Sequence, residues 1–318
     1  MIRPRIAVLL AAYNGMKWIE AQVRSIQDQV GVDVTIFVSV DPSSDGTEAW
    51  VKALSENSTN VVLLPSVGRF GGAGKNFYRL IRDVDFCDFD YVAFSDQDDI
   101  WLSDKLKRAT HFLQNGACDA YSGSVTAFWP SGKSCLLDKS QPQVAWDYLF
   151  EAAGPGCTYV FRLHLAHQIK NALIANWELI QSITLHDWFC YGFARANGYK
   201  WFIDSQSCVL YRQHLQNQVG ANVGLKPLIS RYRTIKSGWW FSQVLLIIQV
   251  LNKSNEIFVR KWIKMGWREL FYLGCQAAQC RRRRRDKILF SVICWVSAFA
   301  RAKDGHLTMT PPDAEERS

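Results

Sequence analysis

Hydrophobic residues in the first third of the chain form short continuous runs, and stretches with helical spacing separate them. Short apolar runs of this kind are typical of strands that are covered on both faces. Between them, apolar residues such as Ile19, Val23 and Ile26 recur every three or four positions. The alternation predicts an α/β fold, with a Rossmann-like, mostly parallel sheet and helices on both faces. The four runs are 6–12, 34–40, 61–64 and 91–94.

The pattern changes after about residue 115. Further strands are predicted over 119–129, 157–161 and 200–210, and helices over 163–175 and 188–196. Polar loops rich in turn-forming residues follow the earlier strands. Because parallel strands end at the same edge of a sheet, and open α/β sheets bind their ligands at that edge, we expect the functional site there.

Three carboxylates follow the fourth apolar run directly. Asp96, Asp98 and Asp99 lie within four residues of each other. Carboxylates this close repel each other and raise each other's pKa values unless a cation lies between them. Oxygen ligands of this kind suit Mg²⁺ or Mn²⁺ better than zinc. The alternative is a solvated acidic turn, or a turn in which Asp99 and Ser103 compete to cap the next helix.

Two nucleotide-binding motifs are absent from the loops where they are expected. The glycine-rich segment 68–75 is not a Walker A motif, because Asn76 stands where Ser or Thr is required. The loop after the first strand, 11–15, lacks the Gly-x-Gly-x-x-Gly of a dinucleotide fold. These absences argue against an NTPase and an NAD-dependent enzyme. The glycines of 68–74 instead predict a loop that passes close to a ligand or to another backbone segment.

Three other loops contain candidate functional side chains, each with a structural alternative. The loop 41–47 is either a tight turn with a cap or a nucleotide contact through Asp41. Asp187 is either a helix N-cap or a general base whose pKa is raised beside Trp188. A strand ends near Arg212, whose guanidinium could face a diphosphate. His214 follows it and is either a structural residue or a third metal ligand.

The charge is distributed unevenly over the 318 residues, whose net charge is +8. Residues 1–224 have a net charge of −3, residues 225–303 a net charge of +14, and the tail 304–318 a net charge of −3. We therefore expect a catalytic domain over 1–224, a basic helical region over 225–303 and a disordered tail over 304–318. An anionic surface is the expected partner of the basic region alone.

The nine cysteines indicate a reducing compartment. The number is odd, no Cys-x-x-Cys pair occurs, and several cysteines lie inside apolar runs, as buried free thiols do. No signal-peptide pattern follows the first residues. These observations predict a cytoplasmic protein.

Two apolar segments in the basic region, 238–248 and 288–300, are too short to span a bilayer, which needs about 20 apolar residues. Helices that lie in the interface of an anionic membrane fit better, with the arginine run 281–285 facing the headgroups. The alternative is packing on the catalytic domain with a solvated charge run. We expect no nucleic-acid partner, because the arginines lack interleaved aromatic residues.

Taken together, the loops resemble those of family 2 glycosyltransferases with the GT-A fold, in the rhamnosyltransferase-like branch. The resemblance covers residues 4–220. Each segment is modest alone, but their order and spacing make a strong signal. The segments that carry it are 12–15, 41–47, 76–77, 95–101, 186–188 and 211–214 with Asn217.

The resemblance implies a role for each candidate residue. Asp187 would be the catalytic base, and Asp98, the last acid of a D-x-D motif, would bind the metal with His214. Two features depart from the family pattern: only Asp41 stands where many members have two acids, and His186 precedes the base where many have Glu. The expected contacts to the nucleotide-sugar donor are Ala12, Tyr13, Asn14, Asp41, Asn76, Asp96 and Arg212.

The function implied is inverting, metal-dependent sugar transfer in cell-surface polysaccharide synthesis. A single base and no carboxylate nucleophile predict inversion. The resemblance favours dTDP-L-rhamnose as the donor, Mg²⁺ or Mn²⁺ as the cofactor, and a glycan or lipid-linked saccharide as the acceptor. The enzyme would then lie peripherally on the inner face of the plasma membrane. The alternatives are a nucleotidyltransferase, which would need a basic glycine-rich loop after the first strand, and a non-catalytic scaffold, which the intact acids argue against.

Overall fold

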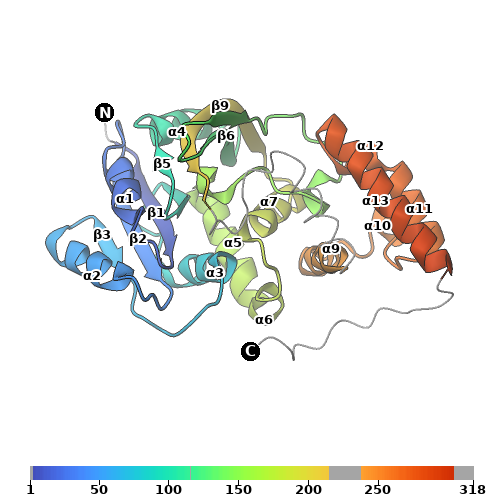
Figure 1. Ribbon diagram of the computed structural model, residues 1–318, viewed down its shortest axis with the longest axis horizontal. Helices are drawn as coiled ribbons and strands as arrows, with labels where there is room; N and C mark the ends of the chain where they lie inside the picture. The colour runs from blue at the N-terminus through green and yellow to red at the C-terminus, as the bar shows by residue number, and fades with distance from the viewer. Residues whose placement is uncertain (1–2, 115, 215–237, 304–318) are drawn as a thin grey trace. The chain divides into compact units, whose positions relative to one another are not determined.

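The computed structural model describes residues 3–114, 116–214 and 238–303 (Figure 1). The chain divides into two compact units, which we describe separately. The sheet unit contains residues 1–141 and 152–222, and the helical unit contains residues 142–151 and 223–318. The tail predicted to be disordered, 304–318, lies outside the described residues.

One sheet organises the sheet unit, with the strand order β3-β2-β1-β4-β8-β6-β9-β5 and with β7 paired to β6. The first four strands are parallel, whereas β8 runs antiparallel to both β4 and β6. The strands are β1 (Arg5–Ala12), β2 (Asp33–Val40), β3 (Val61–Leu63), β4 (Tyr91–Asp96), β5 (Ile100–Trp101), β6 (Ala120–Phe128), β7 (Ser134–Leu137), β8 (Val160–Arg162) and β9 (Trp201–Arg212).

Helices cover both faces of the parallel part. Ile6, Val8 and Leu10 of β1 share one hydrophobic cluster with α1, α2 and α4. The alternate residues Ala7 and Leu9 are also fully buried and point to the opposite face, since neighbouring strand residues point to opposite sides. The helices are α1 (Ile19–Gln27), α2 (Thr47–Asn57), α3 (Ala73–Asp83), α4 (Lys105–Gln114), α5 (Leu163–Ala175), α6 (Trp177–Ile180) and α7 (His186–Ala196), with a 3₁₀ turn η2 (Gly156–Thr158).

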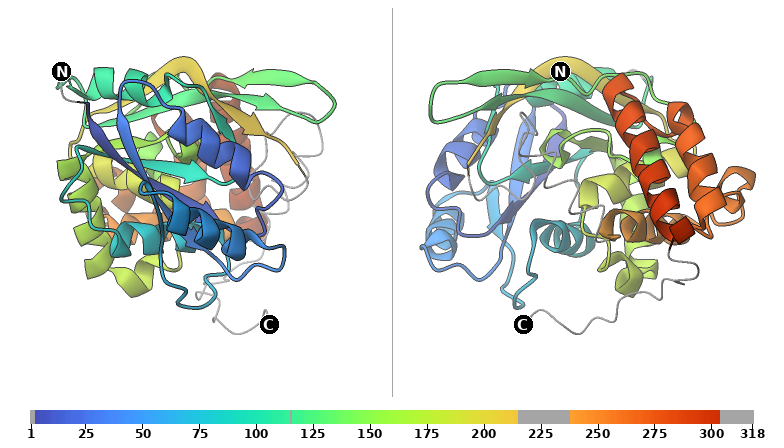
Figure 2. Two further views of the ribbon diagram at one scale, coloured as in Figure 1. Left: turned by 90° about the vertical axis from the view of Figure 1, so that its left-hand side faces the viewer. Right: turned by 45° about the vertical axis from the view of Figure 1, so that its right-hand side comes forward.

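The predicted fold class is therefore confirmed, and the first four β–α units follow one another as predicted (Figure 2, blue to cyan). Two short strands were not predicted. β7 forms a hairpin with β6, and β5 pairs antiparallel with β9. Strands this short carry too few residues for a periodic signal.

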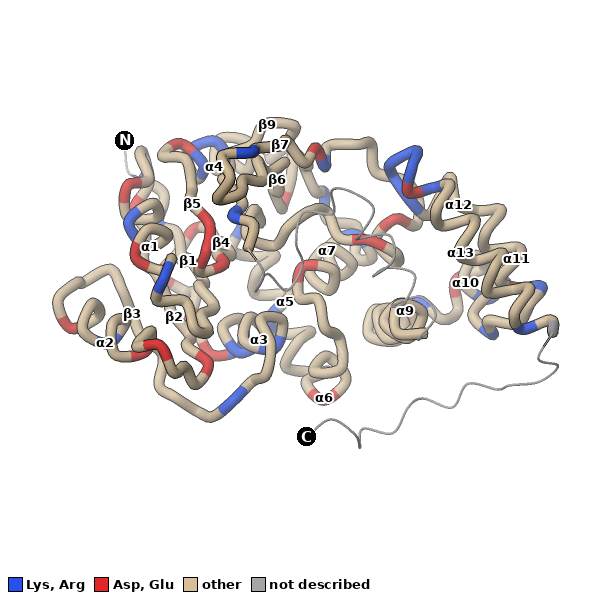
Figure 3. The backbone as a smooth tube through the Cα atoms, in the orientation of Figure 1, with Lys and Arg blue, Asp and Glu red and all other residues tan. Residues whose placement is uncertain are grey.

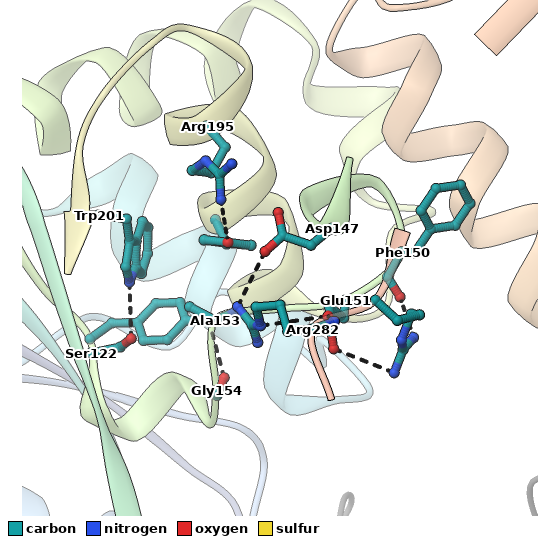
Figure 4. A network of polar contacts seen from close by, with 12 residues as sticks. Ser122, Asp147, Phe150, Glu151, Ala153, Gly154, Arg195, Trp201 and Arg282 are labelled. Carbon is teal, nitrogen blue, oxygen red and sulfur yellow. Dashed lines mark hydrogen bonds and ion pairs between the residues drawn. The ribbon is translucent and has the colours of Figure 1, made fainter. Parts of the chain in front are cut away.

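The described part of the helical unit contains the helices α9 to α13 and a segment that precedes η2 in the sequence. The segment 142–151 is held by ion pairs and hydrogen bonds to the arginines before α13 (Figure 4). Among the described residues, no helix is both long and apolar enough to cross a membrane. The elements are the 3₁₀ turn η1 (Asp147–Leu149) and the helices α9 (Trp239–Val250), α10 (Ile257–Arg260), α11 (Trp267–Cys275), α12 (Ala277–Cys280) and α13 (Arg284–Lys303).

Candidate active site

The loops after β1, β2 and β4 are tied together at one edge of the sheet. The backbone N–H of Asp41 donates to the carbonyl of Ala12 at 2.8 Å. The side chain of Gln97 accepts from the Tyr13 N–H at 2.8 Å and donates to the Tyr13 carbonyl at 2.7 Å. Asn14, with a positive φ of 45°, turns the chain there. The structure thus brings the predicted donor-binding residues Ala12, Tyr13 and Asn14 next to the acidic loop.

The loop 41–47 is a tight turn held by Asp45, but the residue in the N-cap position of α2 is Gly46, so the side-chain cap offered as an alternative does not occur. The carboxylate of Asp45 accepts from the backbone N–H groups of Met16 and Thr47 at 2.9 and 3.1 Å. Asn14 is joined to the same loop, because its side-chain oxygen accepts from the Ser44 N–H at 2.9 Å. The loops after β1 and β2 are consequently one hydrogen-bonded unit.

Asp41 is buried, and its carboxylate holds the glycine-rich loop. One oxygen accepts from the Phe70 N–H at 2.6 Å and the other from the Gly71 N–H at 3.0 Å. Each carboxylate oxygen has a second lone pair, so these bonds leave acceptor capacity for a nucleotide. The donor contact of Asp41 remains a prediction.

Asn76 has a structural position that the sequence did not indicate. Its amide nitrogen donates to the Ser39 carbonyl at 3.0 Å and lies 3.5 Å from the Ala12 carbonyl, so it bridges the ends of β2 and β1. The predicted contact of Asn76 to the donor is untested. The close backbone approach predicted for the glycine-rich loop does occur at Gly74, where a Cβ would lie 2.1 Å from the Thr184 carbonyl oxygen.

The carboxylates after β4 lie in a poorly solvated position (Figure 3, red segment between β4 and β5). Burial, with the Asp98 and Asp187 carboxylates as further causes, raises the pKa of Asp96 to about 8. Asp99 is fully buried, and burial raises its pKa well above the usual range. One oxygen of Asp99 accepts from the Arg212 N–H at 3.1 Å, which joins the acidic loop to the end of β9.

Asp98 and His214, the predicted metal ligands, are in direct contact although 116 residues separate them. The Nε2 atom of His214 lies 2.7 Å from a carboxylate oxygen of Asp98. The imidazole ring stacks on Trp18 with 4.0 Å between the ring centroids, which fixes its orientation. The Nε atom of Arg212 donates to the Asp98 carbonyl at 2.8 Å, so this arginine also positions the acidic loop.

The donor atoms of this cluster fit a hard divalent cation. Asp96 and Asp98 offer carboxylate oxygens and His214 offers an imidazole nitrogen. A second possible set is Asp96, Asp99 and Cys157, whose ligand atoms lie within 4.8 Å of each other. Burial, with the nearby Asp99 and Asp96 carboxylates, raises the pKa of the Cys157 thiol well above its usual range, so it stays protonated and is a poor ligand. By the chemistry of its donor atoms the first set is the better fit, although among the described residues the second set is the one with three ligand atoms this close together.

Asp187 is not a helix N-cap. Helix α7 starts at His186 with Leu185 in the cap position, and the Asp187 carboxylate accepts from the adjacent Trp188 N–H at 2.8 Å. Burial raises the pKa of Asp187 to about 6. Since Asp187 also contributes to the raised pKa of Asp96, the two carboxylates belong to one electrostatic site. A carboxylate with a pKa near neutrality suits a general base.

Gly156 is a site residue that sequence reasoning missed. A Cβ at Gly156 would lie 2.6 Å from His186 Nε2 and 3.2 Å from the Asp187 Cβ, so only glycine lets η2 approach the base. The sequence Gly154–Gly156, with a proline between the glycines, was the available signal. His186 stacks on Phe77 at 3.9 Å between ring centroids, and burial lowers its pKa to about 3, which keeps it neutral.

Comparison with known proteins shows the family of the chain. Residues 7–148 match the family model of glycosyl transferase family 2. The chain is 43% identical over 291 residues to the dTDP-rhamnosyl transferase RfbG of Shigella flexneri, covering 91% of this chain and all of that protein. It is 28% identical over 156 residues, 49% of this chain and 58% of that protein, to the Escherichia coli UDP-Glc:alpha-D-GlcNAc-diphosphoundecaprenol beta-1,3-glucosyltransferase WfgD.

The fold is also shared with a solved structure. A crystal structure of S. aureus TarS (1–349) in complex with UDP matches with a TM-score of 0.54 and 15% identity. The match covers 98% of this chain and 95% of that structure. At this identity the similarity establishes the fold alone.

Proposed function

The chain belongs to glycosyl transferase family 2, and from this premise we propose that it transfers L-rhamnose from dTDP-L-rhamnose to a saccharide acceptor, with inversion at the anomeric carbon. The donor is supported by the 43% identity to a dTDP-rhamnosyl transferase over nearly the whole chain. Membership in this family excludes the non-catalytic scaffold and argues against the nucleotidyltransferase.

The observation that carries the mechanism is the buried carboxylate of Asp187. With a pKa of about 6 it is ionised at neutral pH and still basic enough to take a proton. Asp187 removes the proton of the acceptor hydroxyl while that oxygen forms a bond to the anomeric carbon. The bond from this carbon to the nucleoside diphosphate breaks with its electron pair. One displacement without a carboxylate nucleophile inverts the configuration.

The acids after β4 would assist the departure of the nucleoside diphosphate. Asp98, His214 and Asp96 would hold Mg²⁺ or Mn²⁺, in keeping with their donor atoms and the 2.7 Å contact between Asp98 and His214. When bound, this cation supplies charge neutralisation to the diphosphate. The remaining donor contacts are proposed for Ala12, Tyr13, Asn14, Asp41, Asn76, Asp96 and Arg212.

The proposed acceptor is a lipid-linked saccharide, which one relative's name also specifies as a diphosphoundecaprenol conjugate. An enzyme that acts on such an acceptor works at a membrane surface. The basic helical region supports a peripheral position on the inner, anionic face of the plasma membrane. In this proposal no part of the chain spans the bilayer.

The donor assignment is tested by measuring hydrolysis and transfer with a panel of nucleotide sugars. We expect dTDP-L-rhamnose to be consumed at least about tenfold faster than UDP-glucose or UDP-GlcNAc, since one good donor contact discriminates by that factor. Preference for another nucleotide sugar would refute the donor assignment.

The metal assignment is tested separately. EDTA should stop the reaction, and Mg²⁺ or Mn²⁺ should restore it. Without a cation, nothing at Asp96 and Asp98 offsets the negative charge that develops on the leaving diphosphate. Full activity after chelation would remove the metal role of Asp98 and His214.

A further inference from the structure

The helical unit exposes large apolar side chains from two neighbouring helices. They are between 46% and 68% exposed, whereas core residues of the same helices, such as Leu270 and Cys294, are fully buried. Contiguous exposed apolar surface of this kind marks an interaction site. We call this surface the α11–α13 face, and it consists of Trp267, Phe271, Ile288, Val292, Val296 and Phe299.

Helix α13 has apolar residues on two opposite sides. Phe290, Cys294 and Ala298 recur every four residues and are buried. The exposed residues of α13 recur every three or four positions on the other side, because their spacing also follows the helical repeat. Packing within the helical unit explains the buried stripe, but it does not explain the exposed stripe. The exposed stripe is Ile288, Val292, Val296 and Phe299.

The exposed residues of α11 extend this stripe sideways. The two helices pack against each other in antiparallel directions (Figure 2, right, orange and red). The indole N–H of Trp295 donates to the Phe271 carbonyl at 3.3 Å, and the two rings lie 6.0 Å apart. The Ser291 hydroxyl donates to the Gly274 carbonyl at 2.7 Å. Because Trp295 follows Val292 by three residues on α13, it borders the stripe, and through it Phe271 adjoins the α13 stripe.

The five consecutive arginines have two different roles. Arg281 and Arg282 point into the unit, where they pair with Glu151 and Asp147. Arg284 and Arg285 are exposed at the start of α13. Because Arg284 precedes Ile288 by four residues, it lies on the same side as the apolar stripe.

Other exposed cations border the α11–α13 face. The guanidinium of Arg268 lies 5.1 Å from the ring centroid of Trp267. The described residues of the helical unit hold thirteen basic and five acidic residues. Each of these five acids is buried or half-buried. Figure 3 shows the blue and red positions along the chain. The exposed basic residues on and before α11 are Arg260, Lys261, Lys264 and Arg268.

We propose that the α11–α13 face docks on an anionic lipid bilayer, with its apolar side chains at the headgroup–acyl boundary and Arg284, Arg285 and Arg268 among the lipid phosphates. Apolar side chains bordered by cations are the combination that interfacial helices use. A second copy of the chain fits less well, because its identical face would bring like charges together. The inference rests on the membrane location within the proposed function and assigns it to specific residues.

The test is co-sedimentation of the full-length protein with vesicles of phosphatidylcholine alone or with about 30% phosphatidylglycerol. We expect binding to the anionic vesicles and weaker binding as salt is raised. The double variant Val292→Glu/Val296→Glu should bind at least about tenfold more weakly, because both charges would enter the acyl boundary. A matched control, Val67→Glu/Leu136→Glu, makes the same change at exposed residues of the sheet unit and should bind like the wild type.

A second variant, Arg284→Gln/Arg285→Gln, keeps the apolar residues and should lose about tenfold in affinity for anionic vesicles only. Equal binding of wild type and Val292→Glu/Val296→Glu, or the conversion of a wild-type dimer to a monomer by that variant, would overturn the proposal. Donor hydrolysis in solution, measured on the same proteins, should be unchanged. If the wild type binds anionic vesicles but does not hydrolyse the donor, the proposed function is refuted and the docking proposal is retained.

Discussion

Buried charge is handled differently in the two units. In the helical unit, the guanidinium of Arg282 is 3% exposed and lies 3.7 Å from the Asp147 carboxylate and 3.5 Å from that of Glu151 (Figure 4). In the sheet unit, the Asp187 carboxylate takes part in no ion pair with any described residue, and its pKa rises to about 6. A buried charge with a partner holds structure together, whereas one without a partner is available to a reaction.

The same contrast exists within the sheet unit. The Asp204 carboxylate pairs with Arg108 at 2.6 Å and accepts from the Tyr121 hydroxyl at 2.8 Å, which joins α4, β6 and β9. Asp96, by contrast, has other carboxylates as its electrostatic neighbours. Clustered acids are unfavourable for folding, so their position at the sheet edge makes them candidates for a functional site.

Removing the unpaired charge should have the largest effect. Asp187→Asn keeps the size of the side chain but cannot accept a proton, so kcat should fall by about 10² to 10⁴. The Kd for the donor, measured by calorimetry, should remain within a factor of about three of the wild-type value. Turnover within tenfold of wild type would assign the base to another residue.

Removing a paired charge should affect stability and leave catalysis alone. Arg282→Met removes the buried guanidinium that lies beside Asp147 and Glu151, and the free energy of unfolding of the helical unit should fall by about 3 kcal/mol. Chemical denaturation measures this change. Arg284→Met, at an exposed position of the same run, should change it by less than about 0.5 kcal/mol. Equal effects of the two substitutions would remove the distinction between inward and outward arginines.

Asp187→Asn should also make the protein more stable at high pH. The folded-state pKa is raised, so the wild type loses stability as pH increases from 3.8 through about 6 and the carboxylate ionises in a buried position. At pH 8 the free energy of unfolding of the asparagine variant should be about 1–3 kcal/mol larger than that of the wild type. At pH 4 the two values should differ little.

The control for this stability effect is Asp88→Asn, which changes an exposed acid. It should alter the free energy of unfolding by less than about 0.5 kcal/mol at either pH. A destabilised Asp187→Asn variant at pH 8 would show that the carboxylate has a structural partner, and the contrast between the units would fail.

The sequence predicted the part of the fold in which each strand corresponds to an uninterrupted apolar run. The strands β1, β2 and β4 are such runs, and the loops that follow them lie together because parallel strands end at one edge. The strand β5 has two residues, and its pairing with β9 depends on contacts about a hundred positions away. The local pattern of hydrophobic and polar residues does not predict contacts between segments so far apart.

The site was predictable where the chemistry is in the side chain itself and not where it depends on packing. Asp98 and His214 were expected together because their atoms suit one cation. The stacking of His214 on Trp18 and the absence of a Cβ at Gly156 could not be expected, since both follow from the meeting of distant segments. For the same reason, the attachment of 142–151 to Arg281 and Arg282 was missed.

The central claim is that Asp187, which is buried and forms no ion pair among the described residues, is the base that starts sugar transfer. The pH dependence of kcat/KM for dTDP-L-rhamnose tests it most directly, measured at saturating Mn²⁺ so that the acids of the metal site stay ionised. The account predicts a tenfold rise per pH unit below pH 6, followed by a plateau, because only the ionised carboxylate accepts the proton. A profile that is flat between about pH 5 and pH 8 would contradict it.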